Sequence, residues 1–441
     1  MLMQIMDNYT CLFLFGSLFV LLMLGVPITH AMGISGMIFG VFFWSKGSLY
    51  ALFSSTISTM LSWSLFAVPL FTFMALILFK TGIVEDMYDS LYRFTCGIKG
   101  GLAMCTIVVG ALMGAMTGVV AGTVVALSTI ALPQMLKYGY KKEIAIGSVL
   151  SGGTLGQLIP PSTIMIMYGT MTGVSVGQLF AGGISSGLLL AALYIVWIFI
   201  YCYIINPNAC PTVPKEERFS FRENMKYARP ILPPMLLIVL VLGSIFAGIA
   251  TPTEAASVGC VGAVVLALLN KRLKWKPFKE ACEETLKMTS MVGYITLTAS
   301  FFGQVFIATG GKQFVSKLVS SLPFGNFGLM LILMAIIFFL GMFIDTVAIV
   351  VICAPIFSPI IQIAGFDPLW FALCFIVCIQ CAYLTPPFGF SLFYMKGVAP
   401  KGINLAHIYK SAIPFIVVQV IGLLLCILIP KLAMWGVSVF M

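Results

Sequence analysis

Two Pro-Pro stretches in apolar surroundings decide how this chain folds. Residues 155–169 read LGQLIPPSTIMIMYG, and residues 382–397 read AYLTPPFGFSLFYMKG. A proline removes a backbone donor and clashes with the preceding turn, so each pair should break a helix. In hydrocarbon, the carbonyls freed by such a break need another partner. The two stretches share a pattern at an offset of 226 residues, because Leu158, Pro160, Pro161 and Tyr168 recur as Leu384, Pro386, Pro387 and Tyr394. Matching breaks in matching contexts predict an internal repeat.

The composition places the chain in a lipid bilayer. Of its 441 residues, 61% are hydrophobic and 9% are charged, and the mean hydropathy is +1.10. A soluble protein with this composition would have too little polar surface. The apolar runs are long and continuous, whereas the strands of a membrane β-barrel alternate over short segments. We therefore predict an all-α polytopic membrane protein. Its first apolar stretch lacks a charged leader, so we expect it to be retained.

Several function classes are excluded by what the chain lacks. The net charge of +10 comes from basic residues in short loops, which set topology and do not indicate nucleic-acid binding. The twelve cysteines are scattered without paired C-x-x-C loops, which predicts buried apolar packing and no transition metal. An intramembrane protease needs two aspartates or a Ser-His pair, but only Asp345 lies deep in an apolar run, and His30 and His407 stand alone. No phosphate-binding loop for ATP is present. The chain is not expected to be an enzyme.

The repeat divides the chain into five predicted parts. These are N-terminal scaffold helices (1–80), a first repeat unit (81–184), central scaffold helices and loops (185–308), a second repeat unit (309–412) and a C-terminal helix (413–441). Within 1–80, the region 48–79 leaves two interpretations open, one crossing or one crossing plus an interfacial helix.

Both repeat units have the same internal order. A charge-bearing amphipathic stretch (84–94 or 313–322) precedes two short apolar arms, which are 101–116 with 123–136 in the first unit and 327–343 with 347–361 in the second. Arms of about 15 residues are short for a span at 1.5 Å per residue. We predict two re-entrant hairpins (101–136 and 327–361), each followed by a helix broken at Pro-Pro (143–174 and 368–398).

Charge counting predicts that the two halves are inverted. Arg93 and Lys99 precede the first hairpin, and Lys137, Lys141 and Lys142 follow it. Basic residues on both sides place the mouth of this hairpin in the cytoplasm. Counting crossings from there places the mouth of the second hairpin outside.

Asp345, in GMFIDTVAIVV, is the acidic residue with the clearest candidate role. A carboxylate at the bilayer centre costs about 2.5–3.5 kcal/mol on insertion scales. One interpretation is an N-cap for the returning arm of the second hairpin, with Thr346 beside it. The other is a carboxylate that faces a cation. The two interpretations are compatible.

The turn of the first hairpin, GAMTGVVAGT, offers hydroxyls and carbonyls without a full charge. The hydroxyls come from Thr117 and Thr123. Gly110 and Gly114 predict close helix packing of the small-xxx-small type. Nearer the turn, glycine also allows carbonyls to bend toward an ion. Freed carbonyls and hydroxyls at the Pro-Pro breaks suit a hard monovalent cation, and half-helix N-termini suit a substrate carboxylate.

A capping box explains the polar stretch TPTEAASVG at 251–259. Thr251, Pro252 and Glu254 fit the N-cap, N1 and N3 positions of a helix. We assign this stretch a structural role.

Six motifs together resemble a known transporter family. GIATPTEAA, SLFAVPLF, IKGGLA, LGQLIPPSTIMIMYG, GMFIDTVAIVVICAPIFSPI and LTPPFGF are similar to the large membrane subunit of tripartite ATP-independent periplasmic (TRAP) transporters, the DctM-like family of the ion transporter superfamily. The resemblance runs from about residue 25 to residue 429. It implies an elevator-type symporter in the bacterial inner membrane, with sodium as the coupling ion and no other cofactor. It also implies two partners, a small four-span membrane subunit and a periplasmic substrate-binding protein, and an organic acid as substrate.

The resemblance also implies site residues at the hairpin turns and breaks. The implied sodium-binding residues are Thr117, Gly118, Thr123, Ile159, Pro160, Gly341, Asp345, Thr346, Thr385 and Pro386. The implied substrate-binding residues are Pro161, Ser162, Thr163, Pro387 and Gly389. The chain departs from the family pattern at two points, with TGVVAG in place of a serine-rich first turn and FGFSLF in place of Val-Gly and an Asn. Two other functions remain open, an ion-coupled carboxylate transporter without a binding protein and a channel.

Overall fold

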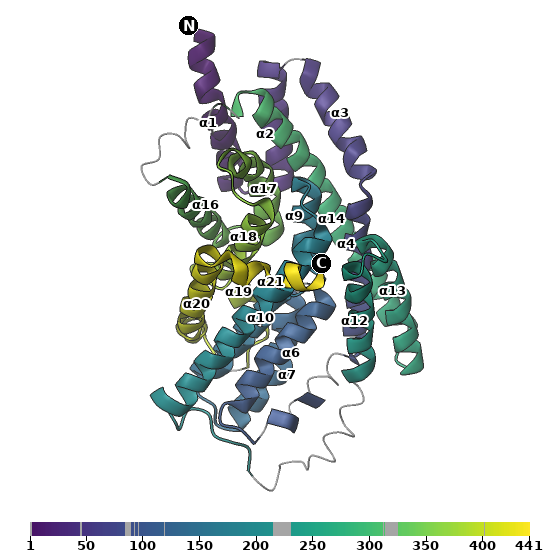
Figure 1. The fold of residues 1–441 in the computed structure, drawn as a ribbon, viewed down its shortest axis with the longest axis vertical. Helices are drawn as coiled ribbons and strands as arrows, with labels where there is room; N and C mark the ends of the chain where they lie inside the picture. The colour runs from purple at the N-terminus through teal and green to yellow at the C-terminus, as the bar shows by residue number, and fades with distance from the viewer. Residues whose placement is uncertain are drawn as a thin grey trace.

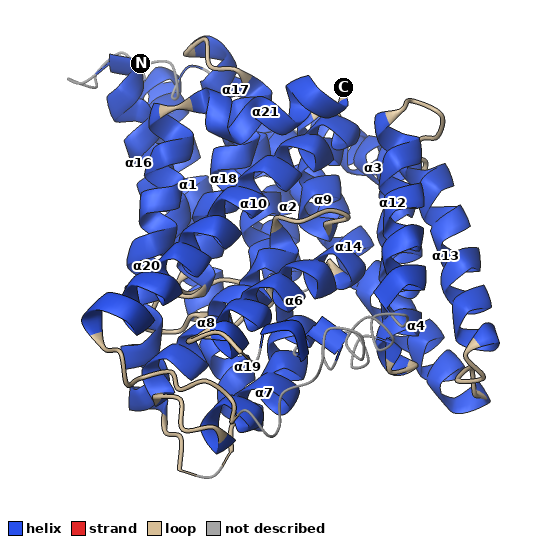
Figure 2. Ribbon diagram, turned by 60° about the horizontal axis from the view of Figure 1, so that its bottom comes forward, coloured by secondary structure: helices blue, strands red, loops and turns tan. Residues whose placement is uncertain are grey.

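The fold is helical throughout the part of the chain that the structure describes. The computed structural model describes residues 2–44, 46–83, 90, 91, 93–95, 97–118, 120–214, 231–311, 313, 325–400 and 402–441. Figure 2 shows helices and loops over these residues, without strands. Seven of the described helices are long and apolar enough to cross a membrane. The predicted all-α polytopic fold is confirmed. The predicted amphipathic stretches, 84–94 and 313–322, lie largely outside the described residues.

A first group of helices comes from the N-terminal and central parts of the chain. It contains α1 (Leu2–Met23), α2 (Ile28–Trp44), α3 (Lys46–Met60), η1 (Trp63–Phe66), α4 (Ala67–Lys80), α12 (Leu232–Phe246), α13 (Pro252–Leu269) and α14 (Trp275–Ala308). Helix α14 packs against α2, α3 and α4, and α13 packs against α4 and α12. Lys80 adds ion pairs to Glu280 (3.4 Å) and Glu284 (2.8 Å). The region 48–79 contains most of the separate helix α3 before the span Trp63–Lys80, and whether α3 lies at a membrane interface stays a prediction.

The predicted capping box opens α13. The Thr251 side chain accepts from the Glu254 backbone, and the Glu254 carboxylate accepts from the Thr251 backbone at 2.8 Å. His407 forms a similar box with Asn404 at the start of α20, which gives this histidine a structural role.

The other helices form a second group in which one order of elements occurs twice. The first series is α6 (Gly101–Thr117), α7 (Val120–Lys137), α8 (Lys142–Thr154), the 3-10 turn η2 (Leu155–Gln157), α9 (Thr163–Thr172) and α10 (Val176–Ile200), which continues as a π-helical turn η3 (Tyr201–Ile205). The second series is α16 (Gly325–Gly341), α17 (Thr346–Ile363), α18 (Pro368–Tyr383), α19 (Phe390–Val398) and α20 (Leu405–Leu428), followed by α21 (Pro430–Phe440). Each series is a helical hairpin, a helix interrupted at Pro-Pro, and a long helix.

Equivalent helices of the two series make equivalent contacts. The first arm of each hairpin packs on its own broken helix, α6 on α8 and α16 on α18. The returning arm packs on the far half of the other broken helix, α7 on α19 and α17 on α9. In Figure 1, the hairpin α6–α7 lies in the lower part of the molecule and α16–α17 in the upper part. The two hairpins therefore enclose both breaks from different ends, although their orientation in a membrane stays a prediction.

Glycines bring the first hairpin close to its broken helix. A Cβ on Gly110 would lie 2.5 Å from the carbonyl of Gly152, and one on Gly114 would lie 2.4 Å from the Cα of Gly156. Helix backbones can approach this closely only where side chains are missing. The packing role predicted for Gly110 and Gly114 is confirmed.

Candidate functional site

The first break satisfies one of its freed carbonyls from within. Helix α8 ends at Thr154, a 3-10 turn follows, and α9 begins at Thr163. The Ser162 hydroxyl donates to the Gln157 carbonyl at 2.7 Å, across the two prolines. Ser162 itself is fully buried. The substrate-binding role that the resemblance implies for Ser162 stays a prediction, and in the structure its hydroxyl also bridges the break.

The tip of the first hairpin rests directly on this break. Gly118 ends α6 with a φ of +59°, and a Cβ at this position would lie 2.5 Å from the carbonyl oxygen of Pro161. The Thr163 hydroxyl donates to the Gly118 carbonyl at 3.4 Å. Four predicted site residues, Gly118, Pro161, Ser162 and Thr163, therefore come together. They present backbone carbonyls and hydroxyls at the N-terminus of α9.

The other predicted residues of the first half lie around this cluster. Thr123 is buried one turn inside α7, because that helix begins earlier than the sequence suggested. Ile159 is half-buried, and a Cβ on Gly187 of α10 would meet its side chain at 2.6 Å. Pro160 is buried. The side chain of Thr117 lies outside the described part of the structure.

The second hairpin places Asp345 at its tip. Asp345 is the N-cap of α17, and its Oδ2 accepts from the Val347 backbone at 3.1 Å. Its Oδ1 accepts from the Tyr383 hydroxyl at 3.2 Å, and Tyr383 lies 3.4 Å from the Tyr394 hydroxyl. Thr346, the first residue of α17, is buried beside it. The predicted capping role is confirmed.

Neutral groups surround the Asp345 carboxylate. The hydrogen bonds described above come from a backbone amide and a phenol, and among the described residues no Lys, Arg or His forms an ion pair with it. Sequence reasoning missed Tyr383 as a member of this site. The signal was present, because Tyr383 immediately precedes the second break and belongs to the same motif as Tyr394.

The second break has its own internal hydrogen bonds. The Ser391 hydroxyl donates to the Tyr383 carbonyl at 2.8 Å, Thr385 donates to the Cys381 carbonyl at 2.7 Å, and Tyr409 donates to the Pro387 carbonyl at 2.6 Å. Gly389 is the N-cap of α19, with a φ of +43°. The carbonyls of Gln157 and Tyr383, which occupy equivalent repeat positions, are thus both satisfied by serines.

The two breaks differ in how much the rest of the chain covers them. Pro160 and Pro161 are buried under the first hairpin, whereas Pro386 is half-buried and Pro387 is exposed. Gly341, at the end of α16, packs on Ala382, where a Cβ would approach the Ala382 Cβ to 2.4 Å. Phe343 of the second tip reaches Phe388 with ring centroids 5.8 Å apart. The second break is the more accessible of the two.

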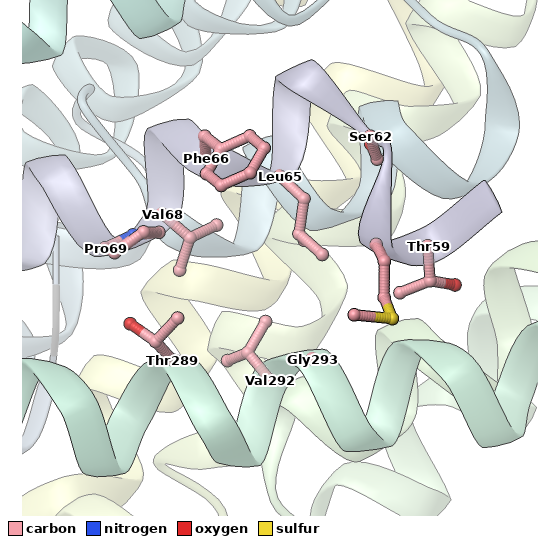
Figure 3. Close-up of a pocket in the computed structure, with 10 residues that line it drawn as sticks. Thr59, Ser62, Leu65, Phe66, Val68, Pro69, Thr289, Val292 and Gly293 are labelled. Carbon is pink, nitrogen blue, oxygen red and sulfur yellow. The ribbon is translucent and has the colours of Figure 1, made fainter. Parts of the chain in front are cut away.

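Two cavities lie away from the breaks. Figure 3 shows one of about 100 Å³ between η1–α4 and α14, lined by residues such as Phe66, Pro69 and Val292. Another, of about 640 Å³, lies between the end of α9 and the start of α18, with Ser175 and Gln362 among its lining residues. None of the predicted ion or substrate residues lines either cavity.

The described residues contain no cluster of three or more His, Cys, Asp and Glu side chains that could hold a metal ion. The described cysteines are free thiols, and most are buried. The site chemistry is therefore that of carbonyls, hydroxyls, two half-helix N-termini and one carboxylate.

Comparison with known proteins agrees with this architecture. The profile of the family "Tripartite ATP-independent periplasmic transporter, DctM component" matches residues 15–432. The C4-dicarboxylate TRAP transporter large permease protein DctM of Pseudomonas aeruginosa is 32% identical over 92% of this chain and 93% of its own length. The ectoine TRAP transporter large permease protein TeaC of Halomonas elongata is 28% identical over 94% and 96%.

A solved structure shares the fold. The YdaH transporter of Alcanivorax borkumensis superposes with a TM-score of 0.63, at 15% identity and with 88% of each chain covered. At this identity the likeness concerns the fold alone. The resemblance found in the sequence motifs is confirmed by the family match. The chain is thus a multi-pass inner-membrane transporter subunit rather than an enzyme, and it belongs to the DctM component family of the tripartite ATP-independent periplasmic transporters.

Proposed function

We propose that this subunit imports an organic acid together with sodium, and that Asp345 binds one of the sodium ions. The observation that carries the proposal is the Asp345 carboxylate at the tip of the second hairpin, held by the Val347 amide and the Tyr383 phenol. A carboxylate in an apolar segment is unfavourable without a counter-charge. A cation at this tip supplies the missing charge.

A second sodium ion is proposed at the first hairpin. There the Gly118 tip, the Pro161 carbonyl and the Thr163 hydroxyl meet. Oxygen atoms of this kind are suitable ligands for a hard monovalent cation, as at the unwound helices of other ion-coupled transporters. The two ion sites then occupy equivalent places in the two repeats, with a full charge only in the second.

The substrate carboxylate is proposed to bind between the breaks. Helices α9 and α19 both begin just after a Pro-Pro pair, so each directs a partial positive charge toward this region. Relatives named for C4-dicarboxylate and ectoine transport support a small carboxylate as the solute. The stretch FGFSLF at 388–393, where the chain departs from the family pattern, follows the second break directly.

Transport by an elevator motion is the mechanism we propose. The group formed by the hairpins and broken helices would move as one body against the group formed by α1–α4 and α12–α14. The proposed partners are a small four-span membrane subunit, which enlarges the stationary group, and a periplasmic substrate-binding protein, which delivers the solute. The family description as one component of a tripartite transporter supports both partners.

The experiment compares two aspartates that both cap helices. Asp345 caps α17 and Asp367 caps α18, where it accepts from Leu369 and Trp370. Asn retains the capping acceptor in each case but removes the charge. In proteoliposomes with both partners present, Asp345→Asn is expected to abolish sodium-driven uptake, and Asp367→Asn to leave it unchanged. Wild-type sodium dependence in a folded Asp345→Asn variant would refute the ion-binding role.

A further inference from the structure

A sealed polar cluster lies where the two repeats meet. Thr154 at the end of α8 accepts from the Gln380 amide of α18 at 3.3 Å, and these residues are 226 positions apart. This separation equals the repeat offset, so the contact joins two equivalent positions. When two repeats are related by an approximate two-fold axis, equivalent residues contact each other only near that axis. Gln419 of α20 also donates to Thr154, at 3.5 Å, and Tyr194 of α10 lies beside all three.

The hydrogen-bond directions in this cluster follow from Thr154. Its hydroxyl donates its single proton to the Ser151 carbonyl at 2.9 Å. It can therefore only accept from Gln380 and Gln419, which must turn their NH2 groups toward it. This orientation leaves the carbonyl oxygens of both glutamines without a hydrogen-bond partner. The Tyr194 hydroxyl also lacks a partner of normal geometry.

These three oxygen atoms are completely enclosed. Gln380, Gln419 and Tyr194 each have 0% exposure, so bulk water does not satisfy them. A buried polar group without a partner costs about 1–3 kcal/mol, and three in one place call for a bound group. The set requires two hydrogen-bond donors for the glutamine carbonyls and one acceptor for the Tyr194 proton.

We propose that one water molecule is bound at this cluster. Water donates twice, to Gln380 Oε1 and Gln419 Oε1, and accepts once from Tyr194, which is the number of bonds usual for buried water. A sodium ion fits less well, because it would leave the Tyr194 proton without an acceptor. With the water in place, hydrogen bonds connect the Ser151 carbonyl to Thr154, Thr154 to the two glutamines, and the two glutamines through the water to Tyr194.

The bound water connects four helices of the two repeats. Each of the two series of helices supplies two of the side chains, from α8 and α10 in the first series and from α18 and α20 in the second. Thr154 and Gln380 each lie six residues before the first proline of a break, Pro160 and Pro386. The cluster thus holds the two breaks at a fixed separation, as part of one rigid body. This inference depends on the geometry of the cluster and not on sodium coupling.

The first test is a high-resolution cryo-electron microscopy map of the complete transporter in nanodiscs. The expected result is a compact density within hydrogen-bonding distance of the Gln380, Gln419 and Tyr194 oxygens, present in sodium and in choline buffer alike. A density that disappears without sodium would overturn the proposal in favour of a cation. A map without the density, with Tyr194 bonded directly to a glutamine, would also overturn it.

The second test measures melting temperatures. Gln380→Met and Gln419→Met each remove one acceptor for the water and leave the others unsatisfied, so each should lower the melting temperature by at least about 3 °C. Because one water serves both residues, the double variant should melt no lower than about the less stable single variant. Tyr194→Phe, which removes only a hydroxyl, should also lower the melting temperature. Shifts that simply add in the double variant would contradict a shared water.

A matched control is available in the other group of helices. Thr72 on α4 has a buried hydroxyl that also lacks a partner, and it belongs to a different group of helices from the glutamine cluster. Thr72→Val removes that hydroxyl at nearly constant volume. Its shift should add to that of Gln380→Met, whereas the shifts of Gln380→Met and Gln419→Met should not. Coupling between Thr72 and Gln380 as large as that between the glutamines would show that the non-additivity is unspecific, which would overturn the shared water.

Discussion

Replacing Gly118 by alanine should lift the first hairpin off the first break and weaken sodium binding. Gly118 has a φ of +59°, a conformation that costs an L-residue about 1–2 kcal/mol. The new Cβ would also lie 2.5 Å from the Pro161 carbonyl oxygen. That oxygen belongs to the backbone and cannot rotate away, so the tip has to withdraw.

The size of the effect follows from these two contributions. Strain and steric contact together should disfavour the seated tip by about 2 kcal/mol or more, which is roughly a 30-fold change in its population. We therefore expect the half-saturating sodium concentration for uptake to rise by at least about tenfold. The assay is a sodium titration of uptake into proteoliposomes, with both partner proteins present and the membrane potential held constant.

Two other glycines separate strain from contact. Gly173 has a φ of +78°, but a Cβ added there would have no atom within 4 Å, so Gly173→Ala should lower the melting temperature without changing the sodium titration. Gly122 has neither a positive φ nor a neighbour within 4 Å, and Gly122→Ala should be neutral or stabilising. A Gly118→Ala variant whose half-saturating sodium stays within about twofold of wild type would refute the reasoning.

Three further predictions concern topology, the second ion site and stability. In a background without the native cysteines, Lys141→Cys should react with an impermeant maleimide only from the cytoplasm, and Gln362→Cys only from outside. Both positions are exposed in the structure. Labelling of both variants from the same side would mean that the two halves are parallel. Tyr383→Phe removes a hydrogen-bond donor to Asp345 and should raise the half-saturating sodium concentration several-fold at a nearly constant maximal rate. A sodium titration identical to that of the wild type would contradict this prediction. Thr251→Val removes a cap and should cost about 1 kcal/mol in stability without changing sodium dependence, which thermal melting and a sodium titration would check.

The backbone architecture could be predicted from the sequence because strong local signals specify it. A Pro-Pro pair in the interior of an apolar run interrupts a helix, so both breaks were visible in the residues themselves, whereas the pair Pro233-Pro234 lies in the first turn of α12 and is tolerated there. Asp345 and Thr251 were recognised as caps for the same reason, since capping depends on a few adjacent residues. Helix ends were less accurate, and α7 begins at Val120, before the predicted start at residue 123.

Contacts between distant segments could not be predicted in this way. The hydrogen bond from Tyr383 to Asp345 spans 38 positions, and the one from Gln380 to Thr154 spans 226. Each depends on how whole helices pack, which no local pattern specifies. The hydrogen bond from Ser162 to Gln157 was not foreseen for a related reason, because its hydroxyl satisfies a carbonyl that becomes free only when the helix breaks.

The most direct test of the proposed function is uptake driven by voltage. A monoanion carried with one sodium ion is electroneutral, whereas two ions, one at each hairpin, move one net charge inward and gain about 2.3 kcal/mol per 100 mV. Proteoliposomes with the complete transporter would be given a constant sodium gradient while a potassium–valinomycin potential is varied. Uptake is expected to rise with an inside-negative potential and to require the binding protein. Uptake that is indifferent to the potential, or that persists without the binding protein, would contradict it.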